Sequence, residues 1–90
     1  MSATISDDDL TKTIFATIME TDLQLDGIHG RKARLRAVTD ATEARMAVVS
    51  TLVREFSVAP DGHYSGIPLD QRQAFLTKLA AVTWHDGRPA

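Results

Sequence analysis

The feature that most constrains the fold is one long amphipathic segment, residues 31–56. At about 100° of rotation per residue, its apolar side chains fall on one side of a helix and its polar side chains on the other. The apolar side carries Leu35, Val38, Thr42, Met46, Val49, Leu52, Val53 and Phe56, and the polar side carries Arg36, Asp40, Glu43, Ser50 and Arg54. This spacing predicts a helix over 31–56 with a broad side that other elements must cover.

A second helix is predicted before this segment, over about residues 7–25. Ser6 followed by Asp7–Asp9 is typical of a helix start, because a hydroxyl caps the free amides and acids favour the positive end of the helix dipole. Leu10, Ile14 and Ile18 follow at intervals of four residues, and Phe15 and Met19 widen their stripe. The Asp26-Gly27 pair predicts the end of this helix, since glycine readily takes the left-handed conformation found there.

The third helix is predicted over about residues 68–85, after a long loop at 57–67. The loop contains Pro60-Asp61-Gly62, which is a turn signature. Pro68 suits a first helical turn. The apolar stripe that follows consists of Leu69, Phe75, Leu76, Leu79 and Val82, and Trp84 and His85 end the predicted helix.

Three amphipathic helices bury one another best as a bundle, so we expect an all-α three-helix bundle. The 90 residues predict a single domain, 1–90, with loose termini at 1–5 and 88–90. A core of this size is small, which favours self-association. The chain has no cysteine and no apolar run long enough for a membrane span or a signal peptide. We therefore expect a cytoplasmic protein that has no membrane partner.

Charge is divided unevenly along the chain. Residues 1–30 carry six acids and one base, whereas residues 31–54 carry six bases and two acids. The short Gly27–Gly30 link predicts an antiparallel hairpin of the first two helices. This hairpin would place Glu20, Asp22 and Asp26 beside Arg31, Lys32 and Arg34. Such surface ion pairs contribute only about 0–1 kcal/mol each, but they account for the clustered bases without a ligand.

A nucleic-acid interface is the alternative interpretation of the same stretch. Exposed amides at a glycine turn, followed by several bases, can bind phosphate. The candidate residues are Gly27, His29, Gly30, Arg31, Lys32, Arg34 and Arg36. The overall net charge of −2 argues against this alternative.

The turn also resembles two nucleic-acid-binding loops. Gly27-Ile28-His29-Gly30 resembles the GxxG loop with which KH domains clamp a nucleic-acid backbone, but the strands that a KH fold needs on either side are not apparent. The stretch LDGIHGRKA is similar to a helix-hairpin-helix loop, in which Gly-apolar-Gly amides meet a DNA phosphate. Here His29 is an extra residue between Ile28 and Gly30. We assign the chain to neither family.

No pattern in the sequence predicts catalysis, a metal or a cofactor. His29, His63 and His85 each lie near an Asp-Gly pair, but none has the spacing of a metal-ligand pair. Ser65 in GHYSG lies one place too late for a nucleophile elbow, and no strand precedes it. We therefore expect a protein that is not an enzyme.

The remaining candidates are residues that suit a protein interface. Aromatic and arginine side chains are enriched at such interfaces. His63, Tyr64 and Trp84 would form a docking patch if they gathered at the long-loop end of the bundle. Arg45 lies at the edge of the apolar side, where it is either a rim residue with its charge in water or a contact to a partner. We expect an adaptor, accessory subunit or mobile-element regulator that binds a protein partner and forms a homo-oligomer.

Overall fold

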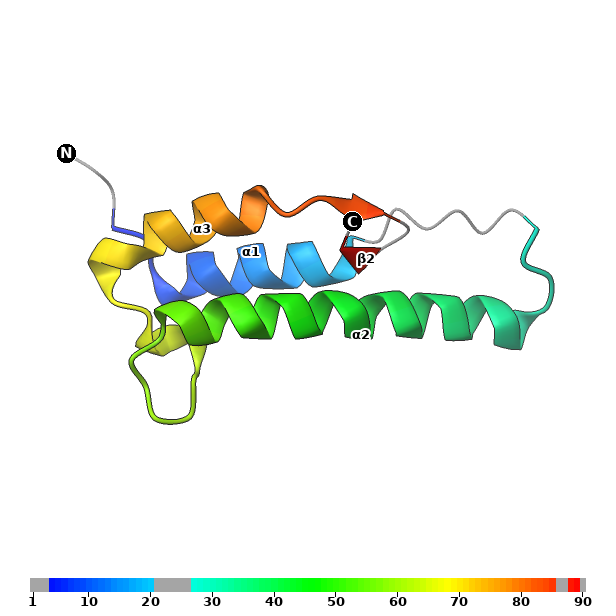
Figure 1. Ribbon diagram of the computed structural model, residues 1–90, viewed down its shortest axis with the longest axis horizontal. Coiled ribbons are helices and arrows are strands. Elements are labelled where there is room, and N and C mark those ends of the chain that lie inside the picture. The colour runs from blue at the N-terminus through cyan, green and yellow to red at the C-terminus, as the bar shows by residue number, and fades with distance from the viewer. Residues whose placement is uncertain (1–3, 21–26, 86–87, 90) are drawn as a thin grey trace.

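The computed structural model describes residues 4–20, 27–85 and 88–89. The elements are α1 (Asp7–Met19), α2 (Arg31–Phe56), the 3-10 turns η1 (Tyr64–Gly66) and η2 (Leu69–Gln71), α3 (Arg72–Ala80), and the strands β1 (Trp84–His85) and β2 (Arg88–Pro89). The predicted all-α fold with three helices is confirmed. In Figure 1, α1 and α3 both lie along α2, which is much the longest of the three. No helix in the described ranges is long and apolar enough to cross a membrane.

The start of α1 is a capping box. The Ser6 hydroxyl accepts a hydrogen bond from the Asp9 amide at 3.1 Å, and the Asp9 carboxylate accepts one from the Ser6 amide at 3.2 Å. The helix ends at Met19, earlier than the predicted residue 25, because Glu20 leaves the helical conformation at φ −80° and ψ 86°. The rest of the predicted extension, residues 21–25, lies outside the described residues.

The core lies between α1, α3 and the C-terminal half of α2. Its buried members are Leu10, Ile14, Val49, Val53, Ile67, Phe75 and Leu79. Each such side chain contributes about 1.5–3 kcal/mol when fully removed from water. Phe56 packs edge to face against Phe75, with ring centres 5.8 Å apart. Ile67 belongs to the 57–67 segment, so this segment is a packed part of the core and not only a connection.

The last third of the chain differs from the predicted helix over 68–85. The first turn is the 3-10 turn η2, and α3 then covers only Arg72–Ala80. Trp84 and His85 do not end a helix; they form β1, in which Trp84 pairs with Pro89 and His85 with Arg88. Val82, Thr83 and Trp84 all favour extended backbone, which explains why the helix stops before them. Arg88 and Pro89, expected in a loose terminus, form β2 and pack against α2.

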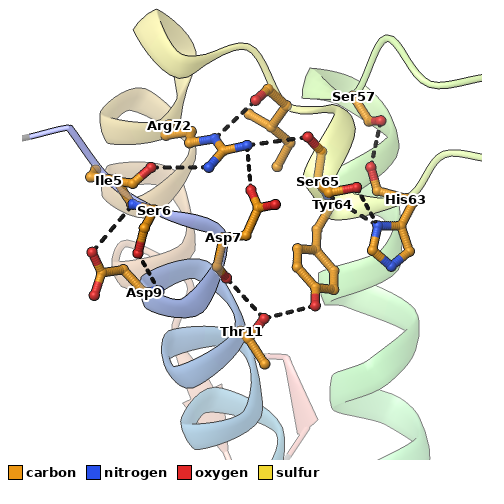
Figure 2. A network of polar contacts seen from close by, with 11 residues as sticks. Ile5, Ser6, Asp7, Asp9, Thr11, Ser57, His63, Tyr64, Ser65 and Arg72 are labelled. Atoms are coloured by element: carbon orange, nitrogen blue, oxygen red, sulfur yellow. Dashed lines mark hydrogen bonds and ion pairs between the residues drawn. The ribbon is translucent and has the colours of Figure 1, made fainter.

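One buried side chain, Arg72, joins the N-terminus of α1 to the loop and to α3 (Figure 2). Only 4% of Arg72 is exposed. Its guanidinium donates to the carbonyl oxygens of Ile67 (2.9 Å), Ile5 (3.0 Å) and Ser65 (3.1 Å), and it forms an ion pair with Asp7 at 2.8 Å. The start of α1 and the segment 65–72, which are far apart in the sequence, therefore meet at one guanidinium group.

We expect Arg72→Met to lower the free energy of unfolding by about 2–4 kcal/mol. Hydrogen bonds from a charged donor are stronger than neutral ones, and three backbone carbonyls would lose their donor together. Chemical denaturation measures this change. The matched control is Lys78→Met, which also removes a base from α3. The ion pair of Lys78 with Glu55, at 3.5 Å, is exposed and so contributes little. Equal losses in the two variants would contradict the role given to Arg72.

Candidate functional site

The most exposed part of the bundle is the first ten residues of α2, Arg31–Asp40, here called the α2 arm. None of them is buried, and the first buried residue of α2 is Ala41. The apolar side predicted for 31–56 is therefore only partly covered: Leu35 is 67% exposed and Val38 is 37% exposed. The reason is length, because α1 and α3 are much shorter than α2 and extend along its C-terminal half (Figure 1).

The bases of the α2 arm have few partners among the residues that the structure describes. The Arg34 side chain donates to the Ile28 carbonyl oxygen at 3.1 Å and so closes the turn before the helix. Arg31, Lys32 and Arg36 are exposed and make no hydrogen bond or ion pair within the described ranges. Among the described residues, nothing neutralises the charge of these three bases.

The expected neutralisation of these bases by Glu20 is wrong. Glu20 lines a cavity together with Arg45, which lies fourteen residues beyond Arg31 on α2. At 1.5 Å per residue, that offset is about 21 Å. The other two expected partners, Asp22 and Asp26, lie outside the described residues.

The glycine turn before α2 does not end a helix as predicted, because α1 already ends at Met19. Gly27 nevertheless has the positive φ that the sequence predicts. Gly27 and Gly30 both have positive φ, +84° and +94°. Gly30 is the N-terminal cap of α2 and offers no side-chain acceptor, and the first turn contains no acid. His29 is exposed beside it. The turn therefore presents its backbone and its bases without a local carboxylate among the described residues.

His63 and Tyr64 lie at the other end of α2 and take part in internal contacts (Figure 2). The His63 ring nitrogen Nδ1 accepts from the Ser65 amide at 3.1 Å, and its ring lies 4.3 Å from that of Tyr64. The Tyr64 hydroxyl accepts from Thr11 of α1 at 2.7 Å. Both residues also line a cavity of about 270 Å³ whose other walls include Ile14, Met46 and Val53.

Arg45 and Trp84 form a separate site near the middle of α2. The prediction that Arg45 is a rim residue with its charge in water is wrong, because only 3% of it is exposed. Its Nη1 donates to the Thr17 carbonyl oxygen at 2.6 Å, and its guanidinium carbon lies 4.4 Å from the centre of the Trp84 ring. The Trp84 side chain, from β1, therefore packs over the guanidinium group of Arg45.

The four residues expected to bind a partner do not gather at one site. The cavity beside His63 and Tyr64 and the cavity beside Arg45 and Trp84 have no lining residue in common. The reason is the early end of α3, which places Trp84 on a strand beyond the helix. Their roles in partner binding stay predictions.

The described residues do not assemble a metal site of three or more histidine or acidic side chains. His63 bonds to Ser65 in the loop, His85 lies in β1, and His29 lies in the turn before α2. The expectations of no metal, no cofactor and no catalytic activity stay predictions.

Sequence reasoning missed the exposed pair Leu35 and Val38 as candidate contact residues. They lie on the same side of the helix as Val49 and Val53, which are buried. The segment itself holds no signal that separates the two pairs, because the difference depends on how far neighbouring helices extend. No protein-family model, curated protein or solved structure matches this chain.

Proposed function

We propose that this protein is a non-enzymatic interaction module that docks on a protein partner and self-associates through its α2 arm. The observation that carries the proposal is the exposure of Leu35 and Val38, 67% and 37%, in line with the side of α2 that faces the core. Exposed apolar side chains that continue a packed helix face are typical of a surface that another helix covers.

The polar side of α2 can stay in water when two copies pair. Arg36, Asp40 and Glu43 lie on that side, opposite Leu35 and Val38, and all three are exposed. In an antiparallel pair of arms related by a two-fold axis, Leu35 and Val38 of each copy are covered by the same residues of the other copy. A different protein partner would need an apolar helix face, bordered by acids that meet the bases of the arm.

We expect Leu35→Asp to weaken self-association at least about tenfold, because the contact would then bury an unpaired carboxylate. Light scattering and sedimentation across a concentration series measure the change. The matched control is Ala33→Asp, which adds the same charge on the opposite, exposed side of the arm. A wild-type chain that stays monomeric at every concentration would contradict self-association, and equal loss in both variants would contradict the assigned surface.

Nucleic-acid binding is the second candidate function, and the open state of Arg31, Lys32 and Arg36 among the described residues favours it. This function predicts binding of a labelled oligonucleotide whose affinity falls with salt, with a slope of about −0.7 to −0.9 per phosphate contacted. It would use the bases of the arm and the turn before them, whereas self-association would use Leu35 and Val38.

We expect Lys32→Glu to abolish oligonucleotide binding at low salt if this second function holds, while Lys12→Glu on α1 leaves it unchanged. Both lysines are exposed and make no bond within the described ranges, so the two variants differ only in position. Fluorescence anisotropy measures the affinity. Absence of binding by the wild-type chain, or equal effects of the two variants, would remove the nucleic-acid function.

A further inference from the structure

The charge of Arg45 is buried without a counter-charge among the described residues. Only 3% of the residue is exposed, and its Nη1 donates to the Thr17 carbonyl oxygen at 2.6 Å. Its Nε is fully buried and has no hydrogen-bond partner within the described ranges. No described carboxylate comes within ion-pair distance of its guanidinium group. Burial of a guanidinium group in this way is unfavourable, so an anion that reaches it gains an unusually strong interaction.

A cavity of about 220 Å³ opens beside this guanidinium group. Its lining comes from all three helices, from β1 and from the residues just after α1 and α3: Thr17, Glu20, Arg45, Leu79, Ala80, Val82 and Trp84. The guanidinium carbon of Arg45 lies 4.4 Å from the centre of the Trp84 ring, which is a cation–π contact. This contact and the hydrogen bond to the Thr17 carbonyl oxygen hold the guanidinium group beside the cavity. Arg45 is therefore held where an acceptor in the cavity can reach it.

We propose that the cavity beside Arg45 and Trp84 binds a carboxylate that carries a short apolar group. A carboxylate can accept two parallel hydrogen bonds from the planar fork of a guanidinium group. Leu79, Val82 and Trp84 supply apolar walls for the attached carbon atoms. Glu20 in the same lining disfavours a doubly charged phosphate. The proposal does not rest on the α2 arm, so it and the proposed function fail separately.

Glu20 is the natural competitor for this site. It is exposed and lines the same cavity, but it forms no ion pair with Arg45. Its negative charge repels an incoming carboxylate, so we expect Glu20→Gln to tighten binding. Tighter carboxylate binding by Glu20→Gln would indicate a ligand site. If Arg45 served only to pair with Glu20, the same substitution would only remove that ion pair.

Trp84 is the only tryptophan of the chain, so its fluorescence reports on this cavity directly. We expect propionate to change the Trp84 emission in a saturable manner, beyond the effect of sodium chloride at equal ionic strength. Arg45→Met should weaken this response at least about tenfold, since a charge-assisted hydrogen bond is lost. The matched control is Arg54→Met, which removes an exposed arginine from the same helix and should leave the response unchanged.

Two peptides distinguish the source of the carboxylate. Acetyl-Gly-Val with a free carboxyl end tests the end of a partner chain, and acetyl-Gly-Val-amide is its uncharged control. Saturation by propionate alone indicates a free small acid, and saturation by the free peptide but not its amide indicates a chain end; both support the proposal. Circular dichroism melting shows that Arg45→Met is folded, and Arg45→Lys provides a second variant that keeps the charge but not the fork. No saturable response to any carboxylate, or an equal response in Arg45→Met, would overturn it.

Discussion

The arrangement of this protein depends on the buried guanidinium group of Arg72. It holds Ile5 and Asp7 at the start of α1, Ser65 and Ile67 in the loop, and its own helix α3, in one hydrogen-bonded set. Because α1 and α3 are joined where both begin, they extend from the same end of the molecule along α2. They have 13 and 9 residues against 26 in α2, about 20 and 14 Å against 39 Å. The α2 arm is the direct consequence of this difference in length.

Two arginines are buried in this small core, and they differ in how their charge is satisfied. Arg72 has an ion pair and three carbonyl acceptors, so its burial stabilises the fold. In the part of the chain that the structure describes, Arg45 has one carbonyl acceptor and an aromatic ring, and its Nε has no partner. This contrast indicates a structural role for Arg72 and supports the proposal that Arg45 binds a ligand.

Local spacing was sufficient to predict much of the fold. The start of α1 at Asp7, both ends of α2 and the core residues Leu10, Val49 and Phe75 follow from caps and helical periodicity. Those signals depend only on residues close in the sequence. The end of α3 was wrong because residues 82–84 favour a strand, and a stripe of apolar residues at 69–82 outweighed that preference in the prediction.

The candidate sites were harder to predict because they depend on contacts between distant segments. Arg72 occupies a position on the apolar side of α3, three residues before Phe75, and this spacing is a signal that sequence reasoning did not use. Arg45 could not be recognised as buried, since its cover is Trp84 from a strand that was predicted as helix. Leu35 could not be recognised as exposed, since the sequence of α2 does not indicate how far α1 extends along it.

The central claim is that α2 consists of a packed half and a projecting arm. Amide hydrogen exchange of the wild-type chain, at a concentration below that of self-association, tests it most directly. We predict that amides at residues 35–40 exchange at least about a hundredfold faster than those at residues 46–56, because helix without tertiary packing opens locally. Equal protection along the whole of α2 would contradict this account.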